Sequence, residues 1–214
     1  MSLTAATYSD AVFNVKNLDE AKRIILTQEV NASSEQRWQQ ETPYIVDLIT
    51  SNVALSPESL VLDFGCGVGR IPKELISATG CRCVGVDTSV SMLALGLSYV
   101  SSDRYLAVSP EMLRYLDLKF DLVLSVWALQ HVRHLEREIN DLTRFMPHKG
   151  KLFIVNEKTR FIPTAEGHWA DDGQNIRKLL EKYFFLVSEG TLSPSATAKG
   201  QPERCFWAVY EHLM

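Results

Sequence analysis

The fold of this chain is decided by the stretch Val61-Leu62-Asp63-Phe64-Gly65-Cys66-Gly67-Val68-Gly69-Arg70. Its first half closes a short apolar run that begins at residue 59, which predicts a buried strand. Three glycines at alternate positions follow, and they let the chain turn tightly out of the strand into a helix. The backbone of such a turn can approach a ligand closely, and the free N–H groups at the helix start can bind an anion or a carboxylate. A purely structural turn is the alternative.

An acidic residue stands at the end of the next predicted strand, Val84-Gly85-Val86-Asp87. An acid about twenty residues after a glycine turn can accept hydrogen bonds from both hydroxyls of a ribose. We therefore expect a ligand that contains a nucleoside. A dehydrogenase site needs Gly-x-Gly-x-x-Gly, whereas the third glycine here comes one residue earlier, which disfavours a nicotinamide oxidoreductase.

Strands and helices are predicted to alternate after the turn. Strands are expected at 83–86, 105–108, 120–126 and 152–155, with helices at 71–76, 90–99 and 135–146. This order is typical of a parallel sheet with helices on both faces. A helix near 176–183 is followed by strands at 184–187 and 206–210, joined without a helix, so the last strand should run antiparallel.

The residues before the glycine turn are predicted to be helical. Apolar positions recur at helical spacing in 19–27, with Asp19 as the candidate N-cap. Thr42 and Pro43 look like an N-cap and a first helical residue of a second amphipathic helix. We expect a single domain over residues 1–214, with an N-terminal helical cap at 1–55 and the core sheet and terminal hairpin at 56–214.

Composition excludes several classes of function. The chain has 214 residues, of which 46% are hydrophobic and 22% charged, as in an ordinary globular protein. Its net charge of −4 offers no long-range attraction to nucleic acid or anionic lipid. The four cysteines are expected to be free thiols without a zinc site. No apolar run approaches the ~18 residues of a membrane span and the N-terminus lacks signal features, so we expect a cytoplasmic protein without a membrane partner.

Four ordered motifs resemble those of class I S-adenosylmethionine-dependent methyltransferases of the small-molecule type. The stretches 61–70 and 84–93 are close to the first two motifs of that family, and 120–132 and 142–155 continue the match. The resemblance covers about residues 45–188, and the terminal hairpin is similar to the last two strands of the family. It implies a Rossmann-like α/β fold: a seven-stranded, mostly parallel sheet with an antiparallel last strand and helices on both faces. The implied cofactor is S-adenosylmethionine, with S-adenosylhomocysteine as product.

The resemblance also implies cofactor-binding roles for matching positions. Asp63 and the turn would hold the methionine moiety, Asp87 the ribose, and Thr88 and Met92 would lie beside the adenine. The family usually has an Asp after the third strand that meets the adenine amino group, and this chain has none, so Ser109, Glu111 or backbone would replace it. The expected cofactor residues are Asp63, Gly65, Cys66, Gly67, Gly69, Asp87, Thr88, Met92, Ser109, Glu111, Met112, Ser125 and Val126.

Methyl transfer depends mainly on holding the acceptor atom at ~3 Å from the methyl group. A hydroxyl or protonated amine acceptor also needs a base. His131, in the loop after the fourth predicted strand, is the candidate catalytic residue because the unperturbed pKa of histidine is about 6.5. The alternative is that His131 caps the end of a buried segment.

Motifs that the chain lacks narrow the range of possible methyl acceptors. At the end of the fourth predicted strand it has Ser125-Val126-Trp127-Ala128, which matches neither the Pro-Pro-aromatic motif of adenine methyltransferases nor the Asp of metal-dependent catechol enzymes. The nucleophilic Pro-Cys setting of cytosine enzymes and the double-Glu loop of arginine methyltransferases are not visible either. We expect a small-molecule acceptor with an O or N nucleophile, no catalytic metal and no nucleic-acid partner.

Aromatic residues in the expected lid segments are candidates for the acceptor pocket. The lid would consist of the N-terminal helices and residues 156–172, and its charged residues, Arg160 and Asp172 among them, are expected on a solvated loop. Packing alone could also explain each aromatic residue. The candidates are Trp38, Trp127, His168 and Trp169.

A non-catalytic protein that binds S-adenosylmethionine, or a scaffold, is the alternative function, because the usual adenine-binding Asp and an obvious catalytic pair are missing. A monomer and a homodimer are both compatible with the sequence.

Overall fold

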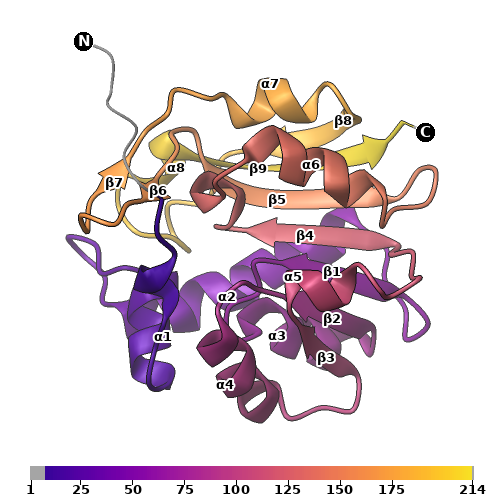
Figure 1. Cartoon of the computed structure of the whole chain (residues 1–214), viewed down its shortest axis with the longest axis horizontal. Coiled ribbons are helices and arrows are strands. Elements are labelled where there is room, and N and C mark those ends of the chain that lie inside the picture. Colours follow the sequence, from indigo (N-terminus) through magenta and orange to yellow (C-terminus); the bar gives the residue numbers. More distant parts are fainter. Residues whose placement is uncertain (1–7, 214) are drawn as a thin grey trace.

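The computed structural model describes residues 8–213 of the chain. One seven-stranded sheet with the order β3-β2-β1-β4-β5-β9-β8 forms its centre (Figure 1). The strands are β1 (Leu60–Phe64), β2 (Arg82–Val86), β3 (Tyr105–Val108), β4 (Leu122–Val126), β5 (Lys151–Glu157), β8 (Phe184–Gly190) and β9 (Cys205–His212). The strand order reverses at β1, which lies between β2 and β4, and ligands of such sheets bind at the carboxyl ends of the strands at this switch point.

The predicted strand directions are confirmed. Strands β1 to β5 pair in parallel, whereas β9 runs antiparallel to both β5 and β8. The connection from β8 to β9 contains only the short helix α8 (Gln201–Arg204), whereas a parallel crossover usually carries a full helix. A separate two-stranded ribbon of β6 (Ile162–Pro163) and β7 (Trp169–Ala170) follows β5.

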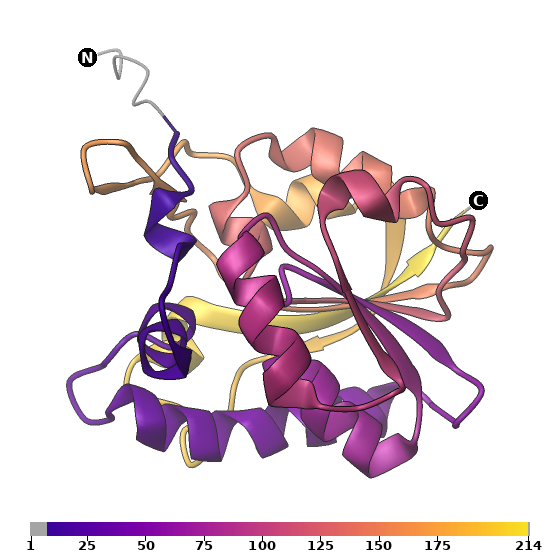
Figure 2. The same ribbon diagram turned by 60° about the horizontal axis from the view of Figure 1, so that its bottom comes forward.

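Helices cover both faces of the sheet because alternate strand residues point to opposite sides. Val61, Leu122 and Leu124 pack with α2 (Ser34–Asn52) and α3 (Arg70–Thr79), whereas Leu62 and Val123 pack with α6 (Leu135–Thr143) and α7 (Ile176–Leu180). Figure 2 shows α2 and α3 below the sheet and α6 and α7 above it. The helices are α1 (Leu18–Ile25), α2 (Ser34–Asn52), α3 (Arg70–Thr79), α4 (Val90–Val100), α5 (Pro110–Leu113), α6 (Leu135–Thr143) and α7 (Ile176–Leu180), with single 3-10 turns η1 (Ala11–Phe13) and η2 (Leu129–His131).

Both predicted helix starts in the N-terminal region are wrong. Helix α1 is capped by Asn17, whose side chain accepts a hydrogen bond from the N–H of Glu20 at 2.9 Å, so Asp19 lies inside its first turn. Helix α2 begins eight residues before Thr42, at a capping box formed by Ser33 and Gln36, and Pro43 lies inside it. Tertiary packing of its buried face outweighs the proline.

The four cysteines are free, as expected, and the structure buries all of them. Within residues 8–213, no group of three or more His, Cys, Asp or Glu side chains could hold a metal ion. Among the helices described, none is both long enough and apolar enough to cross a bilayer.

Candidate functional site

The turn after β1 is built from three glycines in the left-handed region, with φ values of 75° at Gly65, 53° at Gly67 and 74° at Gly69. Side chains would also collide there: a Cβ on Gly65 would lie 2.3 Å from Cβ of Ala128, and one on Gly67 would lie 2.8 Å from Cδ1 of Ile25. Only glycine therefore fits this turn.

The acid after β2 is tied directly to that turn. Oδ2 of Asp87 accepts the N–H of Gly67 at 2.9 Å, and Oδ1 accepts the N–H of Ser89 at 2.8 Å. Burial raises the pKa of Asp87, and the backbone N–H groups oppose that rise. Each carboxylate oxygen keeps a lone pair for a further donor, such as a ligand hydroxyl.

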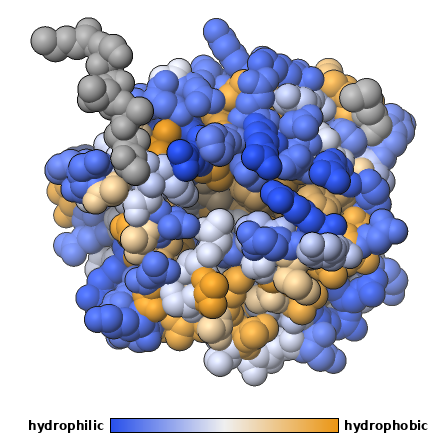
Figure 3. Space-filling view, in the orientation of Figure 1, coloured by the Kyte–Doolittle hydropathy of each residue, from blue (hydrophilic) through white to orange (hydrophobic). Residues whose placement is uncertain are grey.

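A cavity of about 370 Å³ opens at the carboxyl ends of β1, β2 and β4. It forms the hollow near the middle of the face shown in Figure 3. The residues from our sequence-based set that line it are Gly65, Gly67, Asp87, Thr88, Met92, Glu111, Val126, Trp127 and His131. Its size lies in the range typical of small-molecule sites.

The other expected site residues lie outside this lining. Several have structural partners: Ser109 caps α5, Ser125 is fully buried within β4, and Trp38 is a core residue whose indole N–H donates to the hydroxyl of Tyr99 at 3.2 Å. Three are exposed: Met112 is 53% and Trp169 43% accessible, and His168 lies in the turn between β6 and β7. The residues outside the lining are Asp63, Cys66, Gly69, Ser109, Met112, Ser125, Trp38, His168 and Trp169.

A cluster of buried charges supports the glycine turn from behind. Arg37 and Glu41 of α2 form a buried ion pair at 2.6 Å, and Arg70 donates to the hydroxyl of Thr42 at 3.1 Å. Burial lowers the pKa of Arg70 to about 10. Burial raises the pKa of Asp63 to about 7, although Arg70 opposes that rise. Of these residues, only Asp63 was expected in the cofactor site.

The chain after β4 carries His131 into the cavity on a strained turn. Trp127 has a φ of 61°, which is unusual for a non-glycine residue, and its N–H donates to the carbonyl oxygen of Val155 at 2.8 Å. The indole Nε1 of Trp127 is buried and has no hydrogen-bond partner within the part of the chain described. The 3-10 turn η2 follows at once and ends at His131.

Hydrogen bonds determine the tautomer of His131. Its Nδ1 lies 2.6 Å from the carbonyl oxygen of Phe161, and since a carbonyl can only accept, Nδ1 carries the hydrogen. Its Nε2 lies 3.2 Å from Nε2 of Gln130, whose Oε1 accepts the N–H of Glu157 at 2.9 Å. The amide of Gln130 therefore turns its NH₂ toward the ring. His131 is a neutral imidazole with Nε2 as acceptor.

Aromatic rings surround this histidine. Its ring centroid lies 5.1 Å from that of Trp169 and 5.8 Å from that of Phe13. Burial is the main cause that lowers its pKa, to about 4. Trp169 was predicted for the acceptor pocket, whereas Phe13 of the N-terminal segment was not. Trp169 is 43% exposed and lies outside the cavity lining, but its ring packs against that of His131.

The N-terminal segment and the ribbon after β5 meet over the cavity. Tyr8 forms an antiparallel bridge with Thr164, and the N–H of Ser9 donates to the carbonyl oxygen of Pro163 at 3.1 Å. Contrary to expectation, Arg160 does not belong to a solvated loop. It is 0% exposed and is paired with Asp172 at 3.0 Å.

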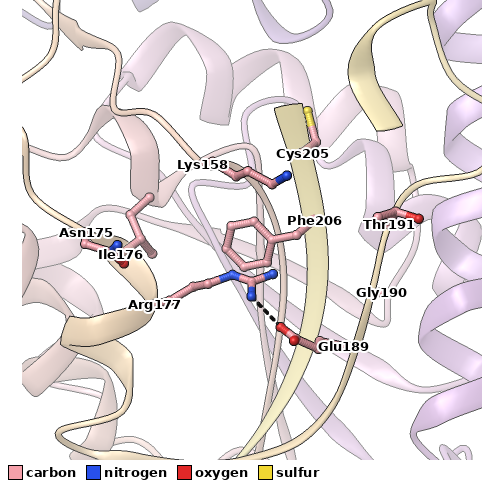
Figure 4. Close-up of a pocket in the computed structure, with 9 residues that line it drawn as sticks. All are labelled: Lys158, Asn175, Ile176, Arg177, Glu189, Gly190, Thr191, Cys205 and Phe206. Carbon is pink, nitrogen blue, oxygen red and sulfur yellow. Dashed lines mark ion pairs between the residues drawn. The ribbon is translucent and has the colours of Figure 1, made fainter. Parts of the chain in front are cut away.

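A second cavity of about 440 Å³ lies beside α7, β8 and β9, away from the glycine turn. Figure 4 shows Arg177 reaching to Glu189 across it; the two are paired at 2.6 Å, and the guanidinium lies 4.1 Å from the ring centroid of Phe206. Nζ of Lys158 donates to the carbonyl oxygen of Glu203 at 2.6 Å. The cations of this cavity are thus engaged with neighbouring groups, and the candidate site is the cavity at the glycine turn.

Comparison with known proteins agrees with this geometry. Residues 62–154 match the family model described as a methyltransferase domain. The chain is 28% identical over 155 residues to the mitochondrial ubiquinone biosynthesis O-methyltransferase of Dictyostelium discoideum, a match that covers 58% of this chain and 47% of that protein. The chain thus spans about half the length of this curated relative.

Solved structures share the fold at low sequence identity. The crystal structure of the [4+2]-cyclase SpnF superposes with a TM-score of 0.67 at 16% identity, covering 89% of this chain and 87% of that one. The N-methyltransferase NodS from Bradyrhizobium japonicum WM9, in complex with S-adenosyl-l-homocysteine, superposes with a TM-score of 0.63 at 15% identity, covering 92% and 99%. Residues 62–154 therefore match the methyltransferase domain family, and the ordered motifs and the sheet order agree with that match.

Proposed function

We propose that this protein transfers the methyl group of S-adenosylmethionine to an oxygen or nitrogen atom of a small molecule bound beside His131. The observation that carries the proposal is that the glycine turn, Asp87 and His131 all line one cavity. When bound, S-adenosylmethionine supplies an electrophilic methyl group on a sulfonium sulfur. Both an O-methyltransferase and an N-methyltransferase stand among the similar proteins, so the acceptor atom stays open between oxygen and nitrogen.

The residues of the cavity support distinct roles in binding the cofactor. Gly65 and Gly67 leave room for a ligand at the backbone, and the free lone pairs of Asp87 suit the two hydroxyls of a ribose. Met92 and Glu111 lie on the side of Asp87, where Met92 can pack against adenine and Glu111 can accept from its amino group. Asp63, behind the turn, would face the ammonium of the methionine moiety.

His131 would orient the acceptor rather than store its proton. Its Nε2 accepts a hydrogen bond, so an acceptor O–H or N–H can replace the amide of Gln130 and direct a lone pair toward the methyl group. With a pKa of about 4, the imidazole is a weak base. The ring would therefore not keep the acceptor proton, which would pass through Nε2 to solvent as the new bond to carbon forms and the carbon–sulfur bond breaks.

Aromatic walls favour an acceptor with a flat apolar surface. Phe13 and Trp169 both pack against the ring of His131, with their own ring centroids 6.3 Å apart, and Phe13 and Trp127 line the cavity. Flat rings bind such walls by stacking or edge-to-face contact. The proposed acceptors are small aromatic molecules that carry a hydroxyl or an amine.

Calorimetric titration tests the cofactor first. We expect S-adenosylmethionine and S-adenosylhomocysteine to bind with micromolar affinity, equivalent to about −8 kcal/mol, and NAD to produce no heat. Phenols and aromatic amines are then screened for transfer of a labelled methyl group. Absence of binding by both nucleosides would refute the proposal.

A non-catalytic protein that binds S-adenosylmethionine is the second candidate, and the low pKa of His131 favours it. The [4+2]-cyclase with the same fold illustrates that this sheet does not by itself specify methyl transfer. Tight cofactor binding without transfer to any acceptor would support it. A cytoplasmic location, the lack of nucleic-acid and membrane partners, the division at residue 55 and a monomeric or homodimeric state stay predictions.

A further inference from the structure

Arg160 is the largest fully buried side chain of the described residues, although it lies in the connection between β5 and β6. A buried arginine is costly unless its donors are satisfied. Nε and Nη2 donate to the two carboxylate oxygens of Asp172 at 3.2 Å and 3.0 Å. This bidentate pair compensates the charge and leaves other donors free to point away from Asp172.

Those remaining donors hold both ends of the turn that carries His131. Nη1 of Arg160 donates to the carbonyl oxygen of Leu129 at 2.8 Å, and Nη2 donates to that of Val132 at 2.7 Å. Leu129 begins the 3-10 turn η2, and Val132 follows its last residue, His131. One guanidinium thus spans the turn from end to end.

The residue after Arg160 completes the same connection. The N–H of Phe161 donates to the carbonyl oxygen of Gln130 at 3.0 Å, and its carbonyl oxygen accepts from Nδ1 of His131 at 2.6 Å. The position of Phe161 therefore decides which nitrogen of His131 carries the hydrogen. Because Arg160 and Phe161 are adjacent, the burial of Arg160 fixes where that carbonyl stands.

We propose that Arg160, oriented by Asp172, is a positioning residue that holds the turn η2 against Phe161, so that His131 keeps its hydrogen on Nδ1 and offers Nε2 as acceptor. The role needs an arginine, because the planar fork contacts three groups in fixed directions, and the single ammonium of a lysine cannot. The inference deepens the proposed function and rests on it only for the contact between His131 and the acceptor.

Ring nitrogen shifts of His131 test the proposal without any acceptor. Protein labelled with nitrogen-15 histidine is followed against pH by long-range proton–nitrogen spectra, and His131→Asn identifies the signal among the five histidines. In the native protein we expect one tautomer, protonated at Nδ1. In Arg160→Met we expect both tautomers, and a pKa that rises from about 4 toward the ordinary value of about 6.5.

Two further variants separate geometry from charge and from folding. Arg160→Lys keeps the positive charge without the fork, and we expect it to show mixed tautomers as well. Asp172→Asn keeps Arg160 but removes its orienting carboxylate, which decides the question if Arg160→Met does not fold. Arg177→Met is the matched control, since it breaks another arginine–carboxylate pair, one that lines the second cavity and not that of His131, and we expect native shifts.

Unchanged nitrogen shifts and an unchanged titration in folded Arg160→Met, or in Asp172→Asn, would overturn the proposal. Calorimetric titration with S-adenosylhomocysteine distinguishes failure of the positioning role from failure of the proposed function. If the native protein bound no nucleoside while Arg160→Met still altered His131, the proposed function would fail and the positioning role would stand.

Discussion

The backbone N–H of Gly67 donates to Oδ2 of Asp87 at 2.9 Å, so the glycine turn after β1 and the acid after β2 form one unit. The two motifs are 20 residues apart in the sequence, but β1 and β2 are paired neighbours in the sheet. The hydrogen bond fixes the carboxylate at the rim of the cavity with lone pairs left for a ribose. Cofactor affinity should therefore depend on this carboxylate.

Asp87→Asn should weaken binding of S-adenosylhomocysteine by about 10- to 150-fold, because hydrogen bonds to a charged group contribute roughly 1.5–3 kcal/mol. Asparagine keeps the size of the side chain and an oxygen for the N–H of Gly67. Calorimetric titration measures the change. Asp103→Asn, at an exposed position between α4 and β3, is the control and should bind like the native protein. Equal affinities for both variants would contradict the ribose role of Asp87.

Gly65→Ala should destabilise the fold and abolish nucleoside binding. The added Cβ would lie 2.3 Å from Cβ of Ala128, and the residue would keep a φ of 75°. Strain at such a φ costs about 1–3 kcal/mol, and the collision adds to it. Gly167→Ala is a matched control because its φ is 77° but no atom lies within 4 Å of the added Cβ.

Thermal unfolding separates the two causes. We expect the stability of Gly167→Ala to fall only by the cost of the unfavourable φ, and its nucleoside affinity to stay native. The stability of Gly65→Ala should fall clearly further. If both variants melted together and bound the nucleoside alike, the close approach of Ala128 to Gly65 would be of no consequence.

The central elements of the fold could be predicted because their signals are local. The run from 120 to 126 is apolar and β-favouring, and β4 indeed occupies Leu122–Val126. The start of α2 was missed because Pro43 outweighed a better signal. The pattern Ser-x-x-Gln from Ser33 to Gln36 is a capping box and could have been read from the sequence.

Some residues of the candidate site could likewise be predicted from the sequence, and others could not. The glycine turn and Asp87 could be predicted because glycine and acid are required at fixed places in the motif. The burial of Arg160 could not, because two of its partners are backbone carbonyls of Leu129 and Val132, which any residue would provide. The tautomer of His131 depends on Phe161, thirty positions away, and equally leaves no local signal.

The low pKa of His131 predicts a pH dependence of stability. The folded pKa of about 4 lies below the ordinary value of about 6.5, so the unfolded state binds more protons between these values. Stability from the neutral ring is complete above pH 6.5 and is lost as pH falls toward 4, up to about 3 kcal/mol. Arg160 disfavours the charged ring, whereas Glu138 across the cavity is an acid whose own pKa burial raises.

Urea unfolding of native protein and His131→Asn at pH 7.5 and pH 4.5 measures this contribution. We expect the native protein to lose more free energy of unfolding than the variant over this interval, since other groups titrate in both. Parallel losses would mean that His131 titrates normally and is open to solvent. In that case the proposed acceptor role of Nε2 would have to include a proton.

We expect Asp63 to lower the stability of the empty protein and to strengthen cofactor binding. Burial raises its pKa to about 7, well above that of an exposed carboxyl, so the unfolded chain releases its proton more readily than the folded one. The pH dependence is opposite to that of His131. Stability falls as pH rises from about 4, the ordinary pKa of a carboxyl, to about 7, and the full destabilisation is present above pH 7. Asp63→Asn removes the titration and should stabilise the empty protein at pH 8, by at most about 4 kcal/mol.

The same variant should bind S-adenosylmethionine more weakly, because the carboxylate that would face the methionine ammonium is gone. Melting temperature and calorimetric affinity, measured at pH 6 and pH 8, test both halves, with exposed Asp47→Asn of α2 as the control. A variant that is less stable than the native protein at pH 8 would show that Arg70 stabilises ionised Asp63 by more than burial costs. A variant that is more stable and still binds fully would restrict Asp63 to a structural role behind the turn.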